Sequence, residues 1–427
     1  MVSERDSKIS LFLTTFNVAK QPLHAADYIS SVAPALPEEP CHLYVFGFQE
    51  FCSVMDSCFE EPATFHLIQE NRIALDTLRN KYGHGLNFTT IGFCHVGATG
   101  IFAITPFPLR FRDCKTATVS CGNGGSSLKG GAGIRVRYVC EESEPTELTF
   151  ANAHLGAYEG EVYYQRRVKN VWTVMRALDF GDGYSFLKPT SHGFFMGDLN
   201  FRTCKNPGDE LPTAELSRLR DQTHESYLKE DVEKLVLKYD ELLQGKSNGD
   251  VFTGFSEACI SFTPTYKYHP NTAIYNSKRC PLWCDRILFQ NTYRKNAPEV
   301  HAYNSIDTYL RSDHRPVYLH ITVPHDAPES MIGHNGNLVI LPSAVPSRHV
   351  TQATRQEMLL PEEDDLVSGP TLMYMKCTAI DKLKQLLVRR VADTSLGYGV
   401  WLGSTPKGRL TLLVAFLLIW ILIYLSR

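Results

Sequence analysis

Lys278 to Leu288 reads KRCPLWCDRIL, and two incompatible chemistries fit this segment. Cys280 and Arg286 stand six positions apart, which is the C-x5-R spacing of phosphatases with a cysteine nucleophile. Alternatively, the motif is PxWCDR, in which Asp285 is the reactive group and both cysteines are bystanders. The residues between Cys280 and Arg286 contain no glycine, but they include a proline without an N–H, a bulky tryptophan and an acid, so they cannot readily wrap a phosphate with backbone amides. We therefore expect Asp285 to carry the chemistry.

The composition limits the classes of protein that fit. The chain has 427 residues, 43% hydrophobic and 21% charged, enough for one large domain or two ordinary ones. Its formal net charge of −3 gives no basic field that would point to nucleic acid as a partner. None of the twelve cysteines stands in paired C-x2-C spacing, and the N-terminus MVSERDSKIS lacks the apolar region of a secretory signal. We expect reduced cysteines in the cytosol and no structural zinc.

Strand-like segments in this chain begin or end with polar residues that can do chemistry. The strand-like segments are 10–18, 42–50, 100–106, 133–139, 147–155, 192–200, 286–289 and 317–323. Helical patterns lie at 161–178 and 213–244. The alternation favours an α/β architecture with a site along one sheet edge. The polar residues at the strand ends are Asn17, Glu50, His154, Asp198, Asn200, Asp285, Asp313 and His314.

The composition changes after residue 323. Residues 324–370 are rich in Pro, Gly, Ser and acids and are interpreted as a linker after a domain of residues 1–323. Residues 371–391 predict a basic amphipathic helix, which either packs on the domain or lies on an anionic membrane surface. Residues 410–425 are almost wholly apolar with flanking cations, and sixteen helical residues span roughly 24 Å.

That terminal segment predicts a membrane anchor. The alternative is a buried core helix, because apolar runs this short are often that. A span slightly shorter than a typical bilayer favours the endoplasmic reticulum, with the mitochondrial outer membrane as the second choice. With two residues beyond the anchor, the rest of the chain is expected on the cytosolic side.

Several motifs together resemble those of one family. The segments FMGDLNFR (195–202), PLWCDRIL (281–288) and SDHRPV (312–317) resemble the signatures of the inositol polyphosphate 5-phosphatases, within the superfamily of deoxyribonuclease-like metal-dependent enzymes. FNV at Phe16, FQE at Phe48, KGG at Lys129, NAHL at Asn152 and the segment 252–268 fit the same order. The resemblance implies two packed mixed β-sheets flanked by helices, a four-layer α/β sandwich, plus the C-terminal transmembrane helix. The tail makes the chain similar to fungal tail-anchored members.

The resemblance also implies an activity: Mg²⁺-dependent hydrolysis of the 5-phosphate of phosphatidylinositol 4,5-bisphosphate at a cytosolic membrane face. It implies a metal site of Asn17, Glu50 and Asp313, because Mg²⁺ prefers hard oxygen ligands. Asp285 is expected to orient His314, and either His314 or Asp198 to take the proton from water. The remaining residues expected at the phosphate are His154 and Asn200, and those expected to bind substrate are Lys129, Arg202, Tyr266, Lys267, Lys278 and Arg279.

Two other functions remain open from the sequence. One is a nuclease or other phosphodiesterase on the same scaffold, which the near-neutral charge and the membrane tail disfavour. The other is a catalytically idle binding protein held at the membrane, which the intact set of acidic and histidine residues disfavours. The expected partners are a phosphoinositide lipid and the membrane, without nucleic acid, and no protein partner is indicated.

Overall fold

The computed structural model describes residues 8–140, 143–202, 229–333, 335–339 and 374–426. The strands are β1 (Lys8–Asn17), β2 (Leu43–Gln49), β3 (Thr89–Val96), β4 (Thr99–Thr105), β5 (Phe111–Ser120), β6 (Gly130–Cys140), β7 (Ser143–His154), β8 (Ser191–Asp198), β9 (Phe255–Ser256), β10 (Asp285–Gln290), β11 (Glu299–Ser305) and β12 (Val317–Pro324). The helices are α1 (Ala25–Val32), η1 (Ala33–Ala35), α2 (Val54–Ser57), α3 (Glu60–Tyr82), η2 (Pro108–Arg110), η3 (Asn123–Gly125), α4 (Glu161–Ala177), α6 (Lys229–Tyr239), α7 (Glu241–Asn248), α9 (Ala379–Leu383), η7 (Lys384–Val388), α10 (Arg389–Ser404) and α11 (Pro406–Leu425).

Two six-stranded mixed sheets form the centre of the molecule. The first has the order β11-β12-β1-β2-β4-β3 and the second β5-β6-β7-β8-β10-β9. Each sheet contains one parallel pair at its middle, β1 with β2 and β7 with β8, and the remaining neighbours are antiparallel. Parallel neighbours end at the same edge of a sheet, so each sheet presents two strand ends together.

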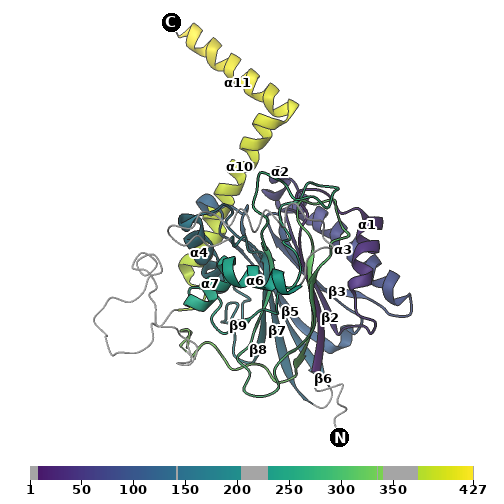
Figure 1. Cartoon of the computed structure of the whole chain (residues 1–427). Coiled ribbons are helices and arrows are strands. Elements are labelled where there is room, and N and C mark those ends of the chain that lie inside the picture. The colour runs from purple at the N-terminus through teal and green to yellow at the C-terminus, as the bar shows by residue number, and fades with distance from the viewer. Residues whose placement is uncertain (1–7, 141–142, 203–228, 334, 340–373, 427) are drawn as a thin grey trace.

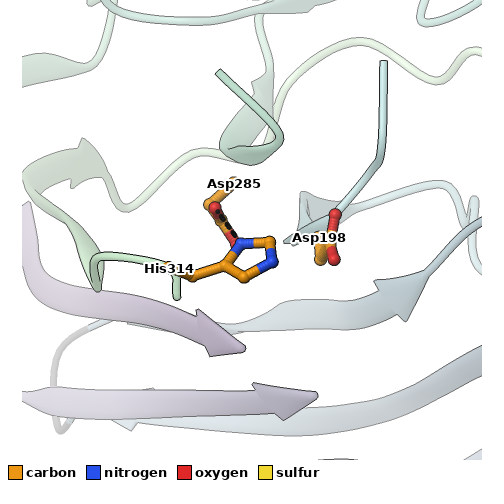
Figure 2. A group of neighbouring side chains, drawn as sticks. All are labelled: Asp198, Asp285 and His314. Carbon is orange, nitrogen blue, oxygen red and sulfur yellow. Dashed lines mark hydrogen bonds and ion pairs between the residues drawn. The ribbon is translucent and has the colours of Figure 1, made fainter. Parts of the chain in front are cut away.

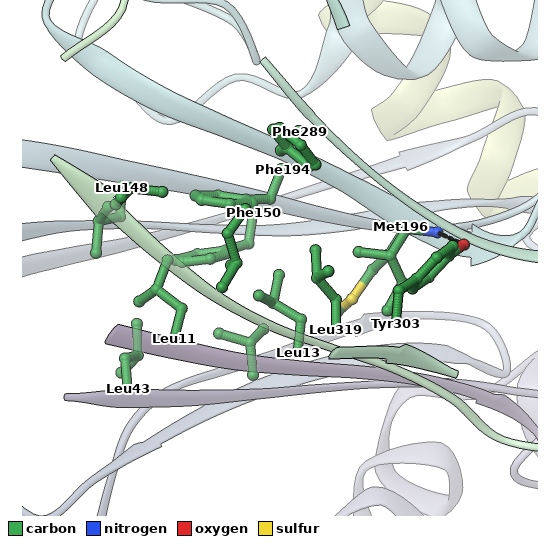
Figure 3. Packing of buried hydrophobic residues seen from close by; sticks show 14 of the residues in the cluster. Leu11, Leu13, Leu43, Leu148, Phe150, Phe194, Met196, Phe289, Tyr303 and Leu319 are labelled. Atoms are coloured by element: carbon green, nitrogen blue, oxygen red, sulfur yellow. Dashed lines mark hydrogen bonds between the residues drawn. The ribbon is translucent and has the colours of Figure 1, made fainter. Parts of the chain in front are cut away.

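The sheets pack face to face because alternate side chains of the central strands point to opposite faces. In β1, Leu11 and Leu13 enter the core between the sheets, whereas Phe12 between them belongs to the outer cluster. In β8, Phe194 and Met196 likewise face the core between the sheets. Figure 3 shows these leucine and phenylalanine side chains filling the space between the two sheets.

Helices cover the outer faces and complete four layers (Figure 1). On the first sheet, α1 and α3 bury Tyr28, Val32 and Leu67 with the outer aromatic residues of the strands. On the second sheet, α4 buries Val171 and Val174 in a further cluster. The predicted four-layer α/β sandwich is therefore confirmed. The helix expected at 161–178 forms as α4; of the helical pattern at 213–244, residues 213–228 lie outside the described part.

The boundary expected at residue 323 is too early. Met331, Ile332 and Leu338 are buried in the cluster beneath α4, so the chain up to residue 339 packs on the second sheet. These three apolar side chains lie within a stretch rich in Gly, Pro and Asn, which is why composition alone indicated a linker. Residues 340–370 lie outside the described residues.

The C-terminal region returns to the domain as a helical arm. We call residues 379–404 (α9, η7 and α10) the C-terminal arm; η7 is a single π-helical turn within it. The helix predicted for 371–391 thus begins at Ala379 and continues to Ser404, with residues 371–373 outside the described part. The arm ends in α11, which leaves the body of the molecule (Figure 1). Of the described helices, α11 alone is long and apolar enough to cross a membrane, with a mean hydropathy of 2.3.

A buried acid in α3 makes the stability of this fold depend on pH. Glu70 is 2% exposed; its Oε1 accepts a 3.4 Å hydrogen bond from the Leu23 amide and its Oε2 has no hydrogen-bond partner among the described residues. Burial raises the pKa of this carboxyl from its ordinary 4.5 to about 8. The folded protein therefore holds a proton that the unfolded chain releases, and stability falls as pH rises from about 4.5 to about 8.

We expect Glu70→Gln to remove this dependence, because the amide has nearly the same shape and carries no charge. The difference in unfolding free energy between variant and wild type should grow by on the order of 1–3 kcal/mol in favour of the variant between pH 5 and 8. Urea unfolding of the detergent-solubilised chain at several pH values measures it. A difference that stays constant with pH would contradict the assignment.

Candidate active site

Strand ends from both sheets meet at one edge of the molecule. In the first sheet, Asn17 closes β1 opposite Gln49, so Glu50 follows β2 directly beside it. In the second sheet, His154 closes β7 opposite Asp198, which closes β8. The antiparallel strand β10 begins at this edge, with Asp285 opposite Asp198. The sandwich therefore brings together polar residues that lie far apart in the sequence.

The two sheets are tied together directly below this edge. The amide of Asn152, on β7, donates to the carbonyls of Phe48 and Gly100 in the first sheet at 3.1 and 2.8 Å, and its Oδ1 accepts from Gln49 at 2.6 Å. Gly47 makes this approach possible, because a Cβ there would lie 2.5 Å from Asn152 Oδ1. The relative position of Glu50 and His154 is thus set by buried hydrogen bonds between the sheets.

Asp285 and His314 form the deepest part of the site. His314 Nδ1 lies 2.9 Å from Asp285 Oδ2, which also accepts a 2.7 Å hydrogen bond from the Thr265 hydroxyl, and all three side chains are buried. Burial alone would lower the pKa of His314, but the Asp285 carboxylate raises it to about 9. His314 is therefore an imidazolium at neutral pH, oriented by a carboxylate. This is the arrangement expected from the sequence for these two residues.

Asp198 is the centre of a second group of contacts. Its Oδ2 accepts from Asn17 Nδ2 at 2.9 Å and lies 3.3 Å from His154 Nε2, and its Oδ1 accepts from the Asn200 amide at 3.1 Å. Burial opposes ionisation of Asp198, but the neighbouring His154, His314 and Lys129 outweigh it and hold the pKa of Asp198 well below its usual range. Asp198 is therefore ionised and able to accept a proton or a hydrogen bond.

Glu50 and Lys129 approach His154 from the other side. The Lys129 amino group contacts His154 Nε2, and Glu50 Oε1 lies 4.0 Å from the same nitrogen. Burial and the charge of Lys129 lower the pKa of His154, so this ring is neutral, in contrast to His314. Burial alone would raise the pKa of Glu50, but the neighbouring His154, Lys129 and Lys20 side chains outweigh burial and lower this pKa below its ordinary value. Glu50 is thus an ionised carboxylate, placed by a backbone turn with φ of 51°.

The acidic residues fit a hard divalent cation, and two neighbouring sets of candidate ligands are present. Ligand atoms of Asp198, Asp285 and His314 lie within 4.8 Å of one another (Figure 2). Because His314 is protonated, the oxygen atoms are the better ligands, and Asp285 Oδ1 is buried without a hydrogen-bond partner among the described residues. Carboxylate oxygens are the donors that Mg²⁺ and Ca²⁺ prefer.

The other ligand set is the one expected from the sequence, and its members are partly engaged elsewhere. Asn17 Nδ2 donates to Asp198 while its Oδ1 accepts from the Ala19 amide at 3.0 Å. Asp313 Oδ2 pairs with Lys267 at 2.8 Å. Glu50, the acidic member of that set nearest to His154, lies 4.0 Å from its Nε2. A cation shared by Glu50 and Asp198 would use one carboxylate from each sheet.

Three of the residues expected to bind substrate lie together: Arg202 and Lys267, which both contact Tyr266, and Tyr266 itself as the third. Arg202 and Lys267 lie over its ring at 5.1 and 5.4 Å, and the ring lies 4.5 Å from that of His314. Arg202 also donates to Asn200 Oδ1 at 2.5 Å. Lys278 and Arg279 are exposed instead, in the turn before Cys280, and no described contact brings Lys278 to the buried cluster. Arg202 and Lys267 therefore lie beside the carboxylate cluster, whereas Lys278 and Arg279 lie outside it.

A network behind Arg202 could not be foreseen from the motifs. Glu241, at the start of α7, accepts from Arg167 at 2.6 Å and from the Arg202 amide at 2.8 Å. Its neighbour Asp240 caps the same helix and pairs with Arg286 at 2.8 Å. The one sequence signal is an acidic pair at a helix start, and that pattern usually indicates a cap and nothing more.

These contacts also decide between the two interpretations of KRCPLWCDRIL. Arg286 is buried between Asp240 and Glu257, so it is not available to hold a phosphate. Burial raises the pKa of Cys280 to about 12, so the thiol is not a nucleophilic thiolate at neutral pH. Neither half of a cysteine-phosphatase motif is functional here, and Asp285 is the group that reaches the site.

Comparison with known proteins identifies relatives of the chain. The family model described as Endonuclease/Exonuclease/phosphatase family 2 matches residues 14–320. The Saccharomyces cerevisiae polyphosphatidylinositol phosphatase INP53 is 32% identical over 46% of this chain and 16% of its own length. The Schizosaccharomyces pombe inositol-1,4,5-trisphosphate 5-phosphatase 1 is 34% identical over 46% of this chain and 16% of its own. The chain thus spans less than a fifth of these relatives.

Solved structures show the fold. The inositol polyphosphate 5-phosphatase domain of a synaptojanin, solved with inositol (1,4)-bisphosphate and calcium, aligns with a TM-score of 0.60 at 24% identity, covering 74% of this chain and 84% of that one. A Cimex nitrophorin in a ferrous NO complex aligns with a TM-score of 0.52 at 18% identity, covering 74% and 99%. Because a nitrophorin solved in a ferrous NO complex shares it, this fold does not by itself specify phosphate chemistry.

We expect Glu241→Ala to destabilise the protein by roughly 3–5 kcal/mol, because Arg167 is then left buried without its partner. Glu241→Gln retains an acceptor oxygen and should cost about half as much. Urea unfolding measures both, and Glu61→Ala on the exposed face of α3 serves as the control, with an expected change below about 0.5 kcal/mol. Equal stability of Glu241→Ala and the control would show that the network is not coupled to folding.

Proposed function

This chain belongs to Endonuclease/Exonuclease/phosphatase family 2, and from that premise we propose that it removes the 5-phosphate of a phosphoinositide, phosphatidylinositol 4,5-bisphosphate, with Mg²⁺ as its metal. The observation that carries the proposal is the buried Asp285–His314 pair facing Asp198, with the cationic residues around Tyr266 beside it. The substrate class is supported by the relatives, which are named as phosphatases of inositol phosphates and polyphosphatidylinositol.

The residue charges support a division of labour in the hydrolysis. The water oxygen bonds to phosphorus while the ester P–O bond breaks, and the ring oxygen that leaves takes up one proton from solvent, which balances the proton that the attacking water gives up. His314, protonated and held by Asp285, donates to an oxygen of the scissile phosphate. Asp198, ionised and hydrogen-bonded by Asn17 and Asn200, orients the water and accepts its proton. Of the two proton acceptors left open by the sequence, these charge states favour Asp198.

The remaining residues bind and screen the phosphates. Lys129 and Arg202 supply positive charge close to His154 and Asn200, and Lys267 and Tyr266 are positioned to contact a neighbouring phosphate of the ring. Glu50 and Asp198, with the Asn17 and Asp313 side chains nearby, would hold the cation. When bound, a divalent cation supplies neutralisation of the phosphate charge.

The tail supports a lipid as the substrate. The arm packs on α2, which begins four residues after Glu50, so the anchor leaves the domain at the end that carries the site (Figure 1). With α11 in a bilayer, this end of the domain faces the membrane surface. We place the chain in the endoplasmic reticulum membrane with the domain in the cytosol, and the mitochondrial outer membrane is the second choice.

The arm also presents an exposed apolar row suited to that surface. Leu383, Leu387 and Val391 are 55%, 53% and 67% exposed and follow one another at the spacing of one helical face. Cations flank the row, while the two acids of the arm, Asp381 and Asp393, turn to the domain. Of the two packing alternatives left open for this helix, one face binds the domain, and we propose that the opposite face lies on anionic lipid.

We expect the full-length protein to release phosphate from phosphatidylinositol 4,5-bisphosphate in vesicles, to lose this activity with chelator and to recover it with Mg²⁺. Asp285→Asn should lower the rate by about 10²–10⁴-fold, because His314 loses its orienting charge. Asp76→Asn, an exposed acid on α3, is the matched control and should leave the rate unchanged.

The same preparation separates the alternatives. No release from any 5-phosphorylated inositide, lipid or soluble, would contradict the proposal. Metal-dependent nicking of plasmid DNA without phosphate release would establish a nuclease instead.

We expect Leu387→Glu to reduce hydrolysis of vesicle lipid about tenfold while leaving hydrolysis of soluble inositol phosphates unchanged, because the charge is repelled from an anionic surface. The matched control is Leu237→Glu, an exposed leucine on α6. Deletion of residues 406–427 should move the protein out of the membrane fraction. Equal losses for Leu387→Glu and Leu237→Glu would exclude a membrane role for the row.

A further inference from the structure

The loop that delivers Lys129 to the site is held partly by four backbone hydrogen bonds of its own and partly by the segments packed against it. It runs from Cys121 to Lys129 between β5 and β6, and it contains two glycines with positive φ, Gly124 and Gly125. Backbone hydrogen bonds close it at its ends, such as the Cys121 amide to the Lys129 carbonyl at 2.8 Å. Glycine has more accessible backbone conformations than other residues, so these two positions allow the loop to adopt alternative conformations. The position of the Lys129 amino group therefore depends on what packs against the loop.

Asn170 of α4 and Ser57 of α2 each contact the loop once, and the C-terminal arm bonds to it at two points, just before the loop at Ser120 and within it at Ser127. The side-chain amide of Gln385 bonds to the backbone of Ser120 twice, accepting from its N–H at 2.7 Å and donating to its carbonyl at 3.2 Å. Asp393 Oδ1 accepts from the Ser127 N–H at 2.7 Å, two residues before Lys129. These bonds join residues about 265 positions apart in the sequence.

Apolar packing fills the space between these two hydrogen-bonded points. A Cβ at Gly125 would lie 2.7 Å from a methyl group of Val388, so the loop backbone lies directly on the arm. At the next turns of the arm, Gly397 rests on Phe59, and Tyr398 meets the Phe59 ring at 5.7 Å. The arm is thus fixed both to the Lys129 loop and to the turn that follows α2.

Charges hold the arm in register on the domain. Arg176 pairs with Asp381 at 2.8 Å, and Arg389 lies 3.6 Å from Asp393, on the side that faces the loop. Arg389 also donates to the Thr118 hydroxyl at 3.2 Å. Asp393 is buried and contacts both a backbone N–H and an arginine, so it is suited to act as a fixed acceptor.

We propose that the C-terminal arm is a positioning element of the active site, in which Gln385 and Asp393 hold the 121–129 loop so that Lys129 reaches the phosphate. This deepens the proposed function and rests on it. Because the arm leads through Thr405 directly into α11, the membrane anchor and the element that positions Lys129 lie on one continuous segment. Displacing a phosphate-binding group by about 1 Å can cost on the order of 10²-fold in rate.

A double-mutant cycle tests the connection in the full-length protein in detergent, with a soluble inositol phosphate so that membrane binding plays no part. We expect Asp393→Ala to lower kcat/KM about tenfold in the wild-type background and less than twofold in a Lys129→Ala background. Asp393→Asn keeps an acceptor oxygen and should restore most of the activity. Ser395→Ala, exposed on the same helix, should have no effect. An equal loss in both backgrounds, or none in either, would overturn the proposal.

A second measurement does not depend on activity. Lys129 is only partly exposed and its amino group contacts His154, so its acylation by an amine reagent, followed by mass spectrometry with the exposed Lys384 as internal reference, reports its position. We expect Asp393→Ala and Gln385→Ala to raise labelling of Lys129 several-fold and Asp393→Asn to leave it low. Unchanged labelling would overturn the proposal. If the protein has no phosphatase activity but labelling of Lys129 increases in Asp393→Ala and Gln385→Ala, the proposed function is rejected. The inference that the arm positions the loop would still hold.

Discussion

Asp198 and Asp285 stand opposite each other on neighbouring strands, and both are buried. The other residues of the site offset the unfavourable free energy of burying these two carboxylates so close together. Two carboxylates removed from water must be protonated, paired with cations or shared with a metal ion. The protein surrounds them with the His314 imidazolium, with His154 and with Lys129. Because the compensating charges come from both sheets, the site forms only when the sandwich is closed.

This constraint links the site to the fold beneath it. The parallel pairs β1/β2 and β7/β8 bring four strand ends to one edge, and the hydrogen bonds of Asn152 with the first sheet set the distance between the two halves. Beyond that edge, Glu241 fixes Arg202, and the C-terminal arm fixes the loop of Lys129. The phosphate-binding cations are therefore supported by structure outside the motifs. The nitrophorin that shares this fold illustrates that the architecture alone permits unrelated chemistry.

Local patterns in the sequence identified the central elements of this structure. The strands that end at the site are rich in apolar residues and end at or next to a carboxylate, an amide or a histidine, so their type and the residues they deliver could be assigned. The less regular outer strands β3, β5 and β11 could not, because their side chains alternate poorly between buried and exposed. The packed segment before residue 339 was mistaken for linker, since a few buried apolar side chains among glycines and prolines leave no periodic signal.

The sequence by itself determined which residue types could do phosphate chemistry, that the segment around Cys280 does not fit a cysteine phosphatase, and that an apolar helix follows the arm. Only the tertiary structure decided which charge each of these groups carries, because the pKa of His314 rises and that of His154 falls for reasons of burial and neighbours that no local pattern records. It alone showed that a helix near residue 390 holds a loop near residue 125. The chemical type of each side chain can be read from the sequence, whereas its electrostatic environment and its packing contacts depend on which residues lie near it in space.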